Sequence, residues 1–509
     1  MPYFARMGRQ SCAVACILAL ASAPGGCGHD WSAADSTDAV PDVADAAETA
    51  DAADADGDAG SDADGGETDV PAEAADDAGD DAGPDVAPCD PTLESCTDGR
   101  LRRCAPDGSG WEEVVCAFGC VPDELRCLQL APANVTDDTL LDRGTTPFGL
   151  DAGARAVFDT GTGEIVVYGG TATDVLVVRP PGVGTLAGIP FTVEDQGSDA
   201  AGLGIWVFSQ LTVTRGATVY ATGPNAMVLL VGGDVSIDGV IDVGGVPDDL
   251  GGGRGPAAGA GGASEEPGQG AGGGRPGRSL GWNEDPGAGG GGYGGRGGEG
   301  GDTTMAPGGA GGTSWGVPEL CPLLGGSGCG GSGGRGGAGG GALQISAAGR
   351  LMIGEGGGIT AGGRGGQGGQ ETGGAGSGGG GGSGGAVLLE AAEVAIRGGV
   401  ACNGGGGGAG ARSTDAPGAD GADGTLTAGP GAAGGEGRGS GTSGGAGSDA
   451  ERIHGAAGIN VEPLSLDDAG GGGGGAGRIR LQGPTIAVEG FLSPAEATGL
   501  ATRGDCATR

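Results

Sequence analysis

The chain has 509 residues, of which 131 are glycine, and only 3% of its residues are aromatic. Segments so poor in large apolar side chains bury little surface, so we expect only about half of the chain to offset the entropy of ordering. The formal net charge is −41 and all 25 basic residues are arginine. This balance argues against nucleic acid and anionic lipid head groups as partners, and it excludes lysine chemistry such as Schiff-base formation.

Residues 1–27 are typical of an export signal. Two arginines precede an apolar run that is too short to span a bilayer as a mature helix. Cleavage after Ala23 would release a secreted protein. The small residues before Cys27 resemble a bacterial lipobox, and we favour lipidation at Cys27. The mature protein would then be held at the outer membrane or cell surface by a lipid anchor.

Residues 28–88 form an Asp/Ala/Gly-rich segment with 20 Asp or Glu residues and no Arg or Lys. Such charges repel each other and keep a chain extended. The segment therefore predicts a disordered acidic tether that separates the following domains from a membrane.

Residues 89–130 form a separate cysteine-rich module. Its six cysteines allow many pairings, and the sequence does not choose among them. A zinc site is the alternative, since Cys116 and Cys120 have ligand spacing. The exported context favours disulfides, which so small a unit needs for stability. The candidate disulfide cysteines are Cys89, Cys96, Cys104, Cys116, Cys120 and Cys127.

Residues 131–509 contain short β-branched and aromatic runs bounded by turn residues, and three such runs recur as a set four times. Apolar residues alternate within the runs, which predicts one face turned inward. Short turns without helices predict an all-β fold, a parallel β-helix or β-solenoid whose coils stack. The sets are 228–231, 235–237 and 240–243; 343–345, 351–353 and 359–361; 387–389, 394–396 and 400–402; and 479–481, 486–488 and Phe491.

Three glycine-rich inserts interrupt these sets, at residues 246–341, 364–385 and 404–477. Each leaves after the third run and returns before the first, which predicts that all lie at one corner of the solenoid. They lack a strict Gly-X-Y period, which disfavours a collagen triple helix. Two states remain open: flexible loops, which we favour, or packed extended polyglycine strands joined through their backbones.

Four further cysteines lie in this region. Cys321 and Cys329, eight residues apart in the first insert, are candidates for a local disulfide. Cys402 occupies an inward strand position, which predicts a small buried thiol and leaves Cys506 unpaired.

The glycine-rich region resembles the Gly-rich β-solenoid surface proteins of bacteria, including adhesin-like and PGRS-type proteins. The cysteine-rich module resembles the short spacers of secreted and lipid-anchored proteins of myxobacteria and related bacteria. The resemblance implies a surface lipoprotein and brings no catalytic motif with it.

Catalytic chemistry finds little support. A Ser-His-Asp or Cys-His arrangement would have to use His454, whose place in an insert predicts a solvated loop residue. Suitably spaced metal ligands and cofactor motifs are missing, so we predict no metal site, cofactor or catalytic residue. β-Helices often act on polysaccharides through aspartates, and Asp234, Asp238 and Asp242 recur every fourth residue, although turn positions would explain them too.

These observations predict an exported, lipid-anchored cell-envelope protein with a structural, adhesive or matrix role and no catalytic activity. Its expected partners are the membrane, through the anchor, and surface polysaccharide or other envelope components. The alternatives are a carbohydrate-binding or polysaccharide-cleaving β-helix, and a largely disordered low-complexity protein.

Overall fold

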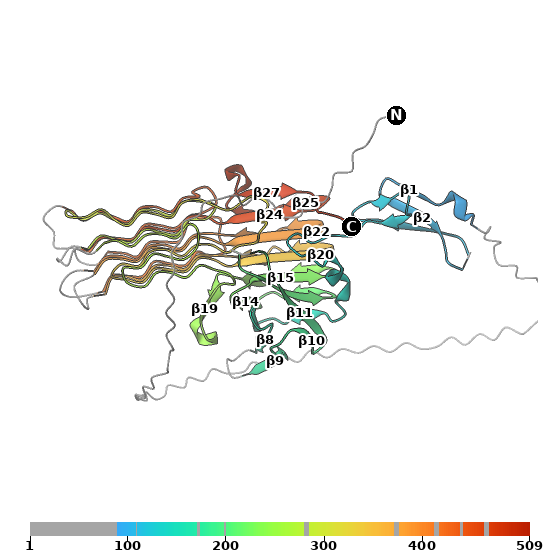
Figure 1. Ribbon diagram of the computed structural model, residues 1–509, viewed down its shortest axis with the longest axis horizontal. Coiled ribbons are helices and arrows are strands. Elements are labelled where there is room, and N and C mark those ends of the chain that lie inside the picture. The colour runs from blue at the N-terminus through green and yellow to red at the C-terminus, as the bar shows by residue number, and fades with distance from the viewer. Residues whose placement is uncertain are drawn as a thin grey trace, which may run out of the picture. The chain divides into compact units, whose positions relative to one another are not determined.

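The computed structural model describes most of the chain from residue 89 onward. The predicted signal, Cys27 and the tether lie outside the described residues. No helix among the described residues is long and apolar enough to cross a membrane. The described residues are nearly all β, as predicted, with only short 3-10 helices (Figure 1). They are residues 89–107, 109–169, 174–197, 200–278, 285–370, 376–411, 417–437, 441–462 and 468–509.

The cysteine-rich module is held by three disulfides, which confirms the disulfide prediction and settles the pairing: Cys89–Cys104, Cys96–Cys120 and Cys116–Cys127. Leu101 is its buried apolar centre, and the guanidinium of Arg102 lies 4.2 Å from the ring centroid of Trp111. Its elements are η1 (Pro91–Leu93), β1 (Ser95–Thr97), β2 (Arg100–Cys104), β3 (Trp111–Val115), β4 (Cys120–Val121) and β5 (Arg126–Cys127).

Two large sheets follow. The twelve-stranded sheet contains β6 (Phe148–Leu150), β10 (Gly184–Leu186), β11 (Ile189–Glu194), β12 (Leu203–Phe208), β13 (Leu211–Val213), β15 (Ala226–Val231), β16 (Val235–Ile237), β20 (Ala342–Ile353), β22 (Ala386–Ile396), β24 (Arg478–Gln482), β25 (Thr485–Val488) and β27 (Ala501–Gly504). The eight-stranded sheet contains β7 (Arg155–Asp159), β8 (Ile165–Tyr168), β9 (Val175–Arg179), β14 (Thr218–Thr222), β17 (Val240–Asp242), β21 (Gly358–Thr360), β23 (Gly399–Ala401) and β26 (Phe491–Ser493). The remaining elements are β18 (Gly245–Val246), β19 (Gly253–Arg254), η2 (Asp138–Arg143), η3 (Asp248–Leu250) and η4 (Glu496–Thr498).

The four repeated sets pair with one another in parallel register, run by run. The first runs align at Leu229, Ile345, Leu389 and Leu481. The second runs align at Ile237, Ile353, Ile396 and Val488. The third runs align at Ile241, Ile359, Val400 and Leu492.

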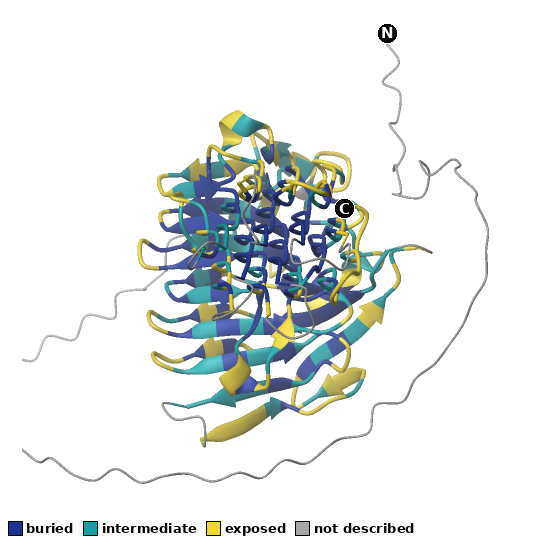
Figure 2. Ribbon diagram, turned by 90° about the vertical axis from the view of Figure 1, so that its left-hand side faces the viewer, coloured by how far each residue is buried: buried dark blue, intermediate teal, exposed yellow. Residues whose placement is uncertain are grey.

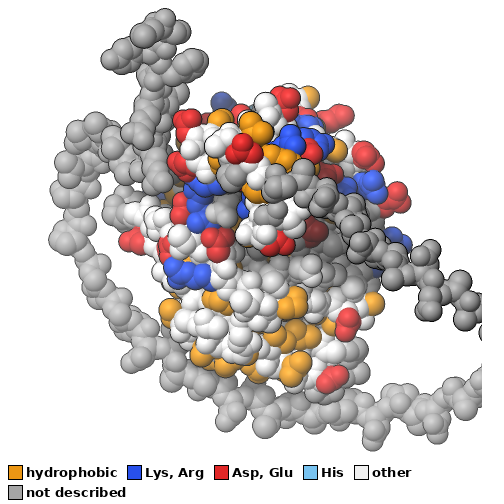
Figure 3. Space-filling model, turned by 90° about the vertical axis from the view of Figure 1, so that its right-hand side faces the viewer, with side chains coloured by type: hydrophobic (Ala, Val, Ile, Leu, Met, Phe, Trp, Pro, Cys, Tyr) orange, Lys and Arg blue, Asp and Glu red, His pale blue; other side chains and the backbone are white. Residues whose placement is uncertain are grey.

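The sheets as a whole are mixed and curled, because the strands before the repeated sets include antiparallel pairs. β10 pairs antiparallel with β11, and β11 with β12. The chain reverses at Ala187 and Gly188, both at positive φ, which suits a two-residue hairpin turn. β9 ends the eight-stranded sheet with exposed Val175, Leu176 and Val177. Apolar side chains gather on the lower part of the face in Figure 3, at the height of β8–β10 in Figure 1.

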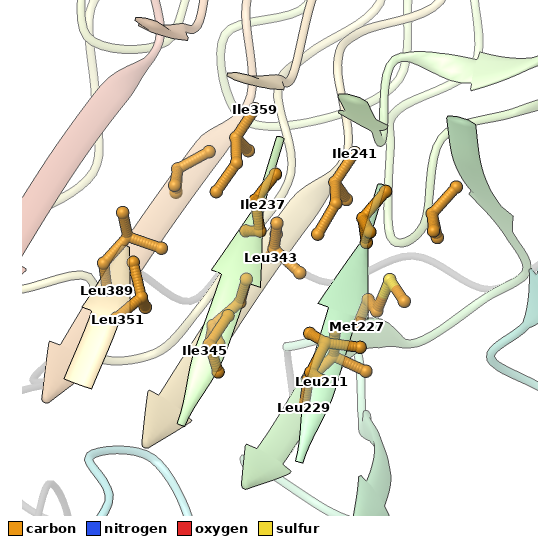
Figure 4. Packing of buried hydrophobic residues seen from close by; sticks show 14 of the residues in the cluster. Leu211, Met227, Leu229, Ile237, Ile241, Leu343, Ile345, Leu351, Ile359 and Leu389 are labelled. Atoms are coloured by element: carbon orange, nitrogen blue, oxygen red, sulfur yellow. The ribbon is translucent and has the colours of Figure 1, made fainter. Parts of the chain in front are cut away.

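The main core lies on the inward side of the paired sets. Alternate residues such as Leu343, Ile345 and Leu351 are fully buried and pack across the repeats (Figure 4). The first runs depart from simple alternation, because all six residues of β15 are buried. A second cluster explains this, since Leu130, Leu140, Leu141, Tyr293, Leu320 and Leu323 pack with outward residues of the first runs.

The described parts of the inserts form a hydrogen-bonded bundle of extended chains, here called the polyglycine bundle (residues 255–341, 361–385 and 402–477). In the inner chains of the bundle, consecutive amides donate to three different neighbouring chains, and the pattern repeats every third residue. From Gly287 to Gly292 the acceptors are, in order, the carbonyl oxygens of Gly301, Gly378, Arg275, Gly298, Gly381 and Gly272. Three residues per turn without internal hydrogen bonds is the geometry of a polyproline II-type helix. The favoured prediction of flexible loops is therefore wrong for the described parts.

Close packing explains why these positions are glycine. A Cβ added at Gly290, Gly408 or Gly474 would lie within 3.0 Å of a backbone carbonyl oxygen of a neighbouring chain. None of the three has a positive φ, so their backbone conformation is open to other residues. Glycine is needed at these positions because the neighbouring chains lie too close together to leave room for a Cβ atom. Viewed toward its end, the bundle is a set of buried coils (Figure 2).

Candidate functional site

A cleft of about 350 Å³ lies where the third runs meet the polyglycine bundle. Its volume is near the lower end of the range for small-molecule sites, ~300–1,000 Å³. The lining residues come from β14, β17, β18 and β21, from the chain just after β17, β18 and β21, and from the third insert: Tyr220, Val240, Asp242, Gly244, Gly245, Pro247, Thr360, Gly362, Arg364, Asp423, Gly424, Thr425 and Leu426.

Three polar side chains of the cleft come from one row across the eight-stranded sheet. Tyr220 is the register partner of Asp242, and Asp242 is the register partner of Thr360. Their strand neighbours Ile241 and Ile359 belong to the main core. Because successive side chains of a strand point to opposite faces, the row of three faces outward, into the cleft.

Asp242 is a half-buried carboxylate. Burial raises the pKa of its side chain to about 6, while the Gly244 amide and the nearby Arg364 guanidinium act to lower it. One oxygen, Oδ1, accepts from the Gly244 amide at 2.8 Å. Burial, and secondarily the Asp242 carboxylate, raise the pKa of the Tyr220 phenol above its usual range. Both groups are therefore neutral over a wider range of pH than on an open surface.

Arg364 is held firmly at the edge of the cleft. Its Nη1 donates to Asp423 Oδ2 at 2.8 Å, and its Nη2 donates to the Val246 carbonyl oxygen at 3.2 Å. Asp423 in turn accepts from the Gly365 amide at 2.8 Å. A Cβ at Gly245 would lie within 3.0 Å of the guanidinium, so glycine at that position lets Arg364 approach.

Thr360 is 5% exposed, and its hydroxyl has no hydrogen-bond partner in the part of the chain that the structure describes. A buried hydroxyl left unpaired costs roughly 1–3 kcal/mol. The same hydroxyl can both donate and accept. The cleft thus contains an unused donor and acceptor beside Asp242.

The three aspartates singled out in the sequence separate in the structure. Asp234 Oδ1 accepts from the Arg350 amide at 2.8 Å, which is the backbone role expected of a turn residue. Asp238 lies in the turn between β16 and β17 and does not line the cleft. Asp242 alone lines it. Sequence reasoning missed Thr360 and Arg364, because nothing local marks an outward threonine or an insert arginine as a partner of Asp242.

His454 is exposed in the polyglycine bundle, where its Nδ1 accepts from the Arg296 amide at 3.0 Å. This hydrogen bond ties two chains of the bundle together and is a structural contact. Within the described residues, no group of three or more His, Cys, Asp or Glu side chains is placed to hold a metal ion.

The predicted local disulfide in the first insert does not form. Cys329 is a free, buried thiol whose Sγ donates to the carbonyl oxygens of Gly337 and Gly380, and Cys321 is disulfide-bonded elsewhere. Cys329 is held inside the bundle by these contacts and does not form a disulfide with Cys321. Cys402 is a free buried thiol and Cys506 is free, as predicted.

A second polar cluster surrounds Glu390, which is fully buried on the outward side of β22. Its carboxyl group accepts from Ser346 Oγ at 2.7 Å, from Gln344 Nε2 at 2.9 Å and from the Ala133 amide at 3.1 Å. Burial raises the pKa of Glu390 to about 7, and these donors act to lower it. The cluster joins the segment before η2 to the first runs and has the character of a structural network.

The cleft brings hydroxyl, carboxylate and guanidinium groups together beside an apolar wall. Such a set suits recognition of a small ligand rich in hydroxyl groups. The chain matches no protein-family model, no curated protein and no solved structure.

Proposed function

We propose that the protein is an exported, lipid-anchored cell-envelope protein with a structural, adhesive or matrix role and no catalytic activity. In this proposal the lipid is attached to Cys27 and residues 28–88 separate the folded part from the membrane. The observation that supports the role is the polyglycine bundle. A large part of the chain is used for a closely packed body with few reactive side chains, which suits contact and spacing.

We also propose that the repeated sets form a β-solenoid. Support comes from the three parallel ladders, in which each run pairs with the same run of the next set. Stacked coils bury a continuous core that no single coil could bury alone. The antiparallel strands β8–β11 would then cover one end of the stack.

A polysaccharide-cleaving activity is the weaker alternative. The cleft has two lining carboxylates, Asp242 and Asp423. Asp423 is committed to Arg364 and to the Gly365 amide, which leaves it poorly placed to act as an acid or base.

The role is tested in a bacterium that exports the full chain. Labelled fatty acid should enter the wild type and be absent from Cys27→Ser, which should appear in the medium. Cells bearing the wild type should adhere to one another more strongly than cells bearing Gly408→Val, in which the added side chain meets the backbone of a neighbouring chain. Equal labelling of Cys27→Ser would overturn the anchor, and equal cohesion with Gly408→Val would overturn the role of the bundle.

A further inference from the structure

We propose that the cleft beside Asp242 binds one sugar ring of a neutral polysaccharide, with Asp242, Thr360 and Arg364 contacting its hydroxyl groups. This inference goes beyond the structural role and does not depend on the lipid anchor. It assigns a ligand class to a site lined by β14, by two of the repeated sets and by residues of all three inserts.

The polar groups of the cleft fit a ligand that carries adjacent hydroxyl groups. A sugar hydroxyl both donates and accepts, and so does the Thr360 hydroxyl, which is buried and unpartnered. Asp242 uses one oxygen for the Gly244 amide, and its carboxylate can accept further hydrogen bonds. A ligand hydroxyl that pairs with Thr360 would remove the cost of leaving that group unsatisfied.

The remaining lining provides an apolar surface. Val240, Pro247 and Leu426 line the same cleft as the Tyr220 ring. The faces of a pyranose ring carry C–H groups, which pack against such side chains while the ring edge makes hydrogen bonds. Small-molecule sites commonly combine an apolar lining with a few placed polar groups.

The charges of the cleft disfavour an anionic sugar as the ligand. Two carboxylates face one guanidinium, and Arg364 is already paired with Asp423. Nearby, Arg155 is paired with Asp249 at 2.6 Å. An anionic sugar would therefore meet excess negative charge with no free cation among the lining residues. A metal ion would find too few carboxylates in the described residues.

The site is also rigid, which favours binding because little ordering remains to be done. Asp242 and Thr360 are on paired strands, and Arg364 is held by two hydrogen bonds from its guanidinium. Gly362, just before the second insert, and Gly424, within the third insert, both line the cleft wall, where the Gly424 amide donates to the Gly363 carbonyl oxygen at 2.8 Å.

Calorimetric titration of the detergent-solubilised full chain tests the proposal. The probes are neutral hexose oligosaccharides, N-acetylhexosamine oligosaccharides and an oligouronate. We expect a neutral oligosaccharide to bind, with affinity reduced at least tenfold in Thr360→Val and in Asp242→Asn. Thr485→Val makes the same substitution at an exposed position of β25, outside the cleft, and should bind like the wild type.

Thr360→Val also separates loss of the site from loss of the fold. The variant removes an unpaired buried hydroxyl and keeps the branched shape, so its melting temperature should equal or exceed that of the wild type. Absence of binding to every neutral probe would overturn the proposal. Binding of the oligouronate alone, or equal affinity in the variants, would do so as well.

Discussion

At the residue scale, the described structure places an ionisable group inside the protein without a cation as direct partner. Glu390 is fully buried and satisfied by hydroxyl, amide and backbone donors. A buried carboxyl group favours its neutral form, because burial removes the hydration that stabilises the charge. Asp242 shows the same effect more weakly, since it borders a cleft.

The raised pKa of Glu390 predicts a pH-dependent stability. Between its usual pKa of 4.5 and its folded value of about 7, the folded state holds a proton that the unfolded state releases. The free energy of unfolding should therefore fall as pH rises through this window, by up to about 3 kcal/mol from this residue. Urea denaturation at several pH values measures the slope.

Glu390→Gln should flatten that slope, because an amide does not titrate. Its absolute stability is not the readout, since the amide changes the hydrogen bonding around residue 390. Asp242→Asn is the matched comparison, and its effect should be confined to the range between pH 3.8 and about 6. An unchanged slope in Glu390→Gln would contradict the prediction.

At the element scale, the inserts show how a segment without side chains can be ordered. The inner chains of the bundle donate their amides in three directions, so their backbone groups are paired although their apolar surface is small. The absence of Cβ atoms lets the chains approach closely enough for these bonds. Composition alone suggested disorder, because the usual compositional argument considers burial of side chains and not backbone pairing between chains.

A methyl group inside the bundle should be disproportionately costly. Gly408→Ala places a Cβ within 3.0 Å of the Gln367 carbonyl oxygen, and both groups are backbone atoms that cannot swing away. We expect a loss of at least ~1–3 kcal/mol in the free energy of unfolding, measured in denaturant. Gly149→Ala on β6 is the control, because its Cβ would meet nothing within 4 Å, and its effect should stay within about 0.5 kcal/mol. Equal effects of the two substitutions would contradict the close packing of the bundle.

At the scale of the whole molecule, the strands and the bundle are continuous in their hydrogen bonding. The Gly341 amide donates to Val243, and the Ala361 amide donates to Ala401, at the points where strands become polyglycine chains. The main core lies beside these junctions through Ile359 and Val400. The β strands from β12 onward and the bundle should therefore unfold as one cooperative unit.

Hydrogen exchange in Ile359→Ala tests this cooperativity. Ile359 is fully buried, and its truncation should cost about 2–5 kcal/mol. Exchange of the Gly405, Gly408 and Gly474 amides should accelerate by the same factor as that of β20 and β22. Acceleration confined to the strands would show that the bundle opens independently of the core.

The sequence by itself determined the properties that depend on neighbours along the chain. Period-two alternation located the runs of the four repeated sets, whose alignment then matched the pairing at Leu229, Ile345 and Leu389. Cysteine density and export context indicated a disulfide module. Of the candidate site, the sequence offered Asp242 alone.

The tertiary structure decided everything that depends on groups brought together from distant positions. Such properties include the disulfide pairing and the cleft around Asp242 and Thr360. They also include the packing of the described parts of the inserts into a hydrogen-bonded bundle. The raised pKa of Glu390 is another, because the segment that covers it lies more than two hundred residues away along the chain. Local patterns specify which face of a strand is apolar. They do not specify which backbone or side chain covers a glycine, a hydroxyl or a carboxyl group, and that neighbour sets its energy.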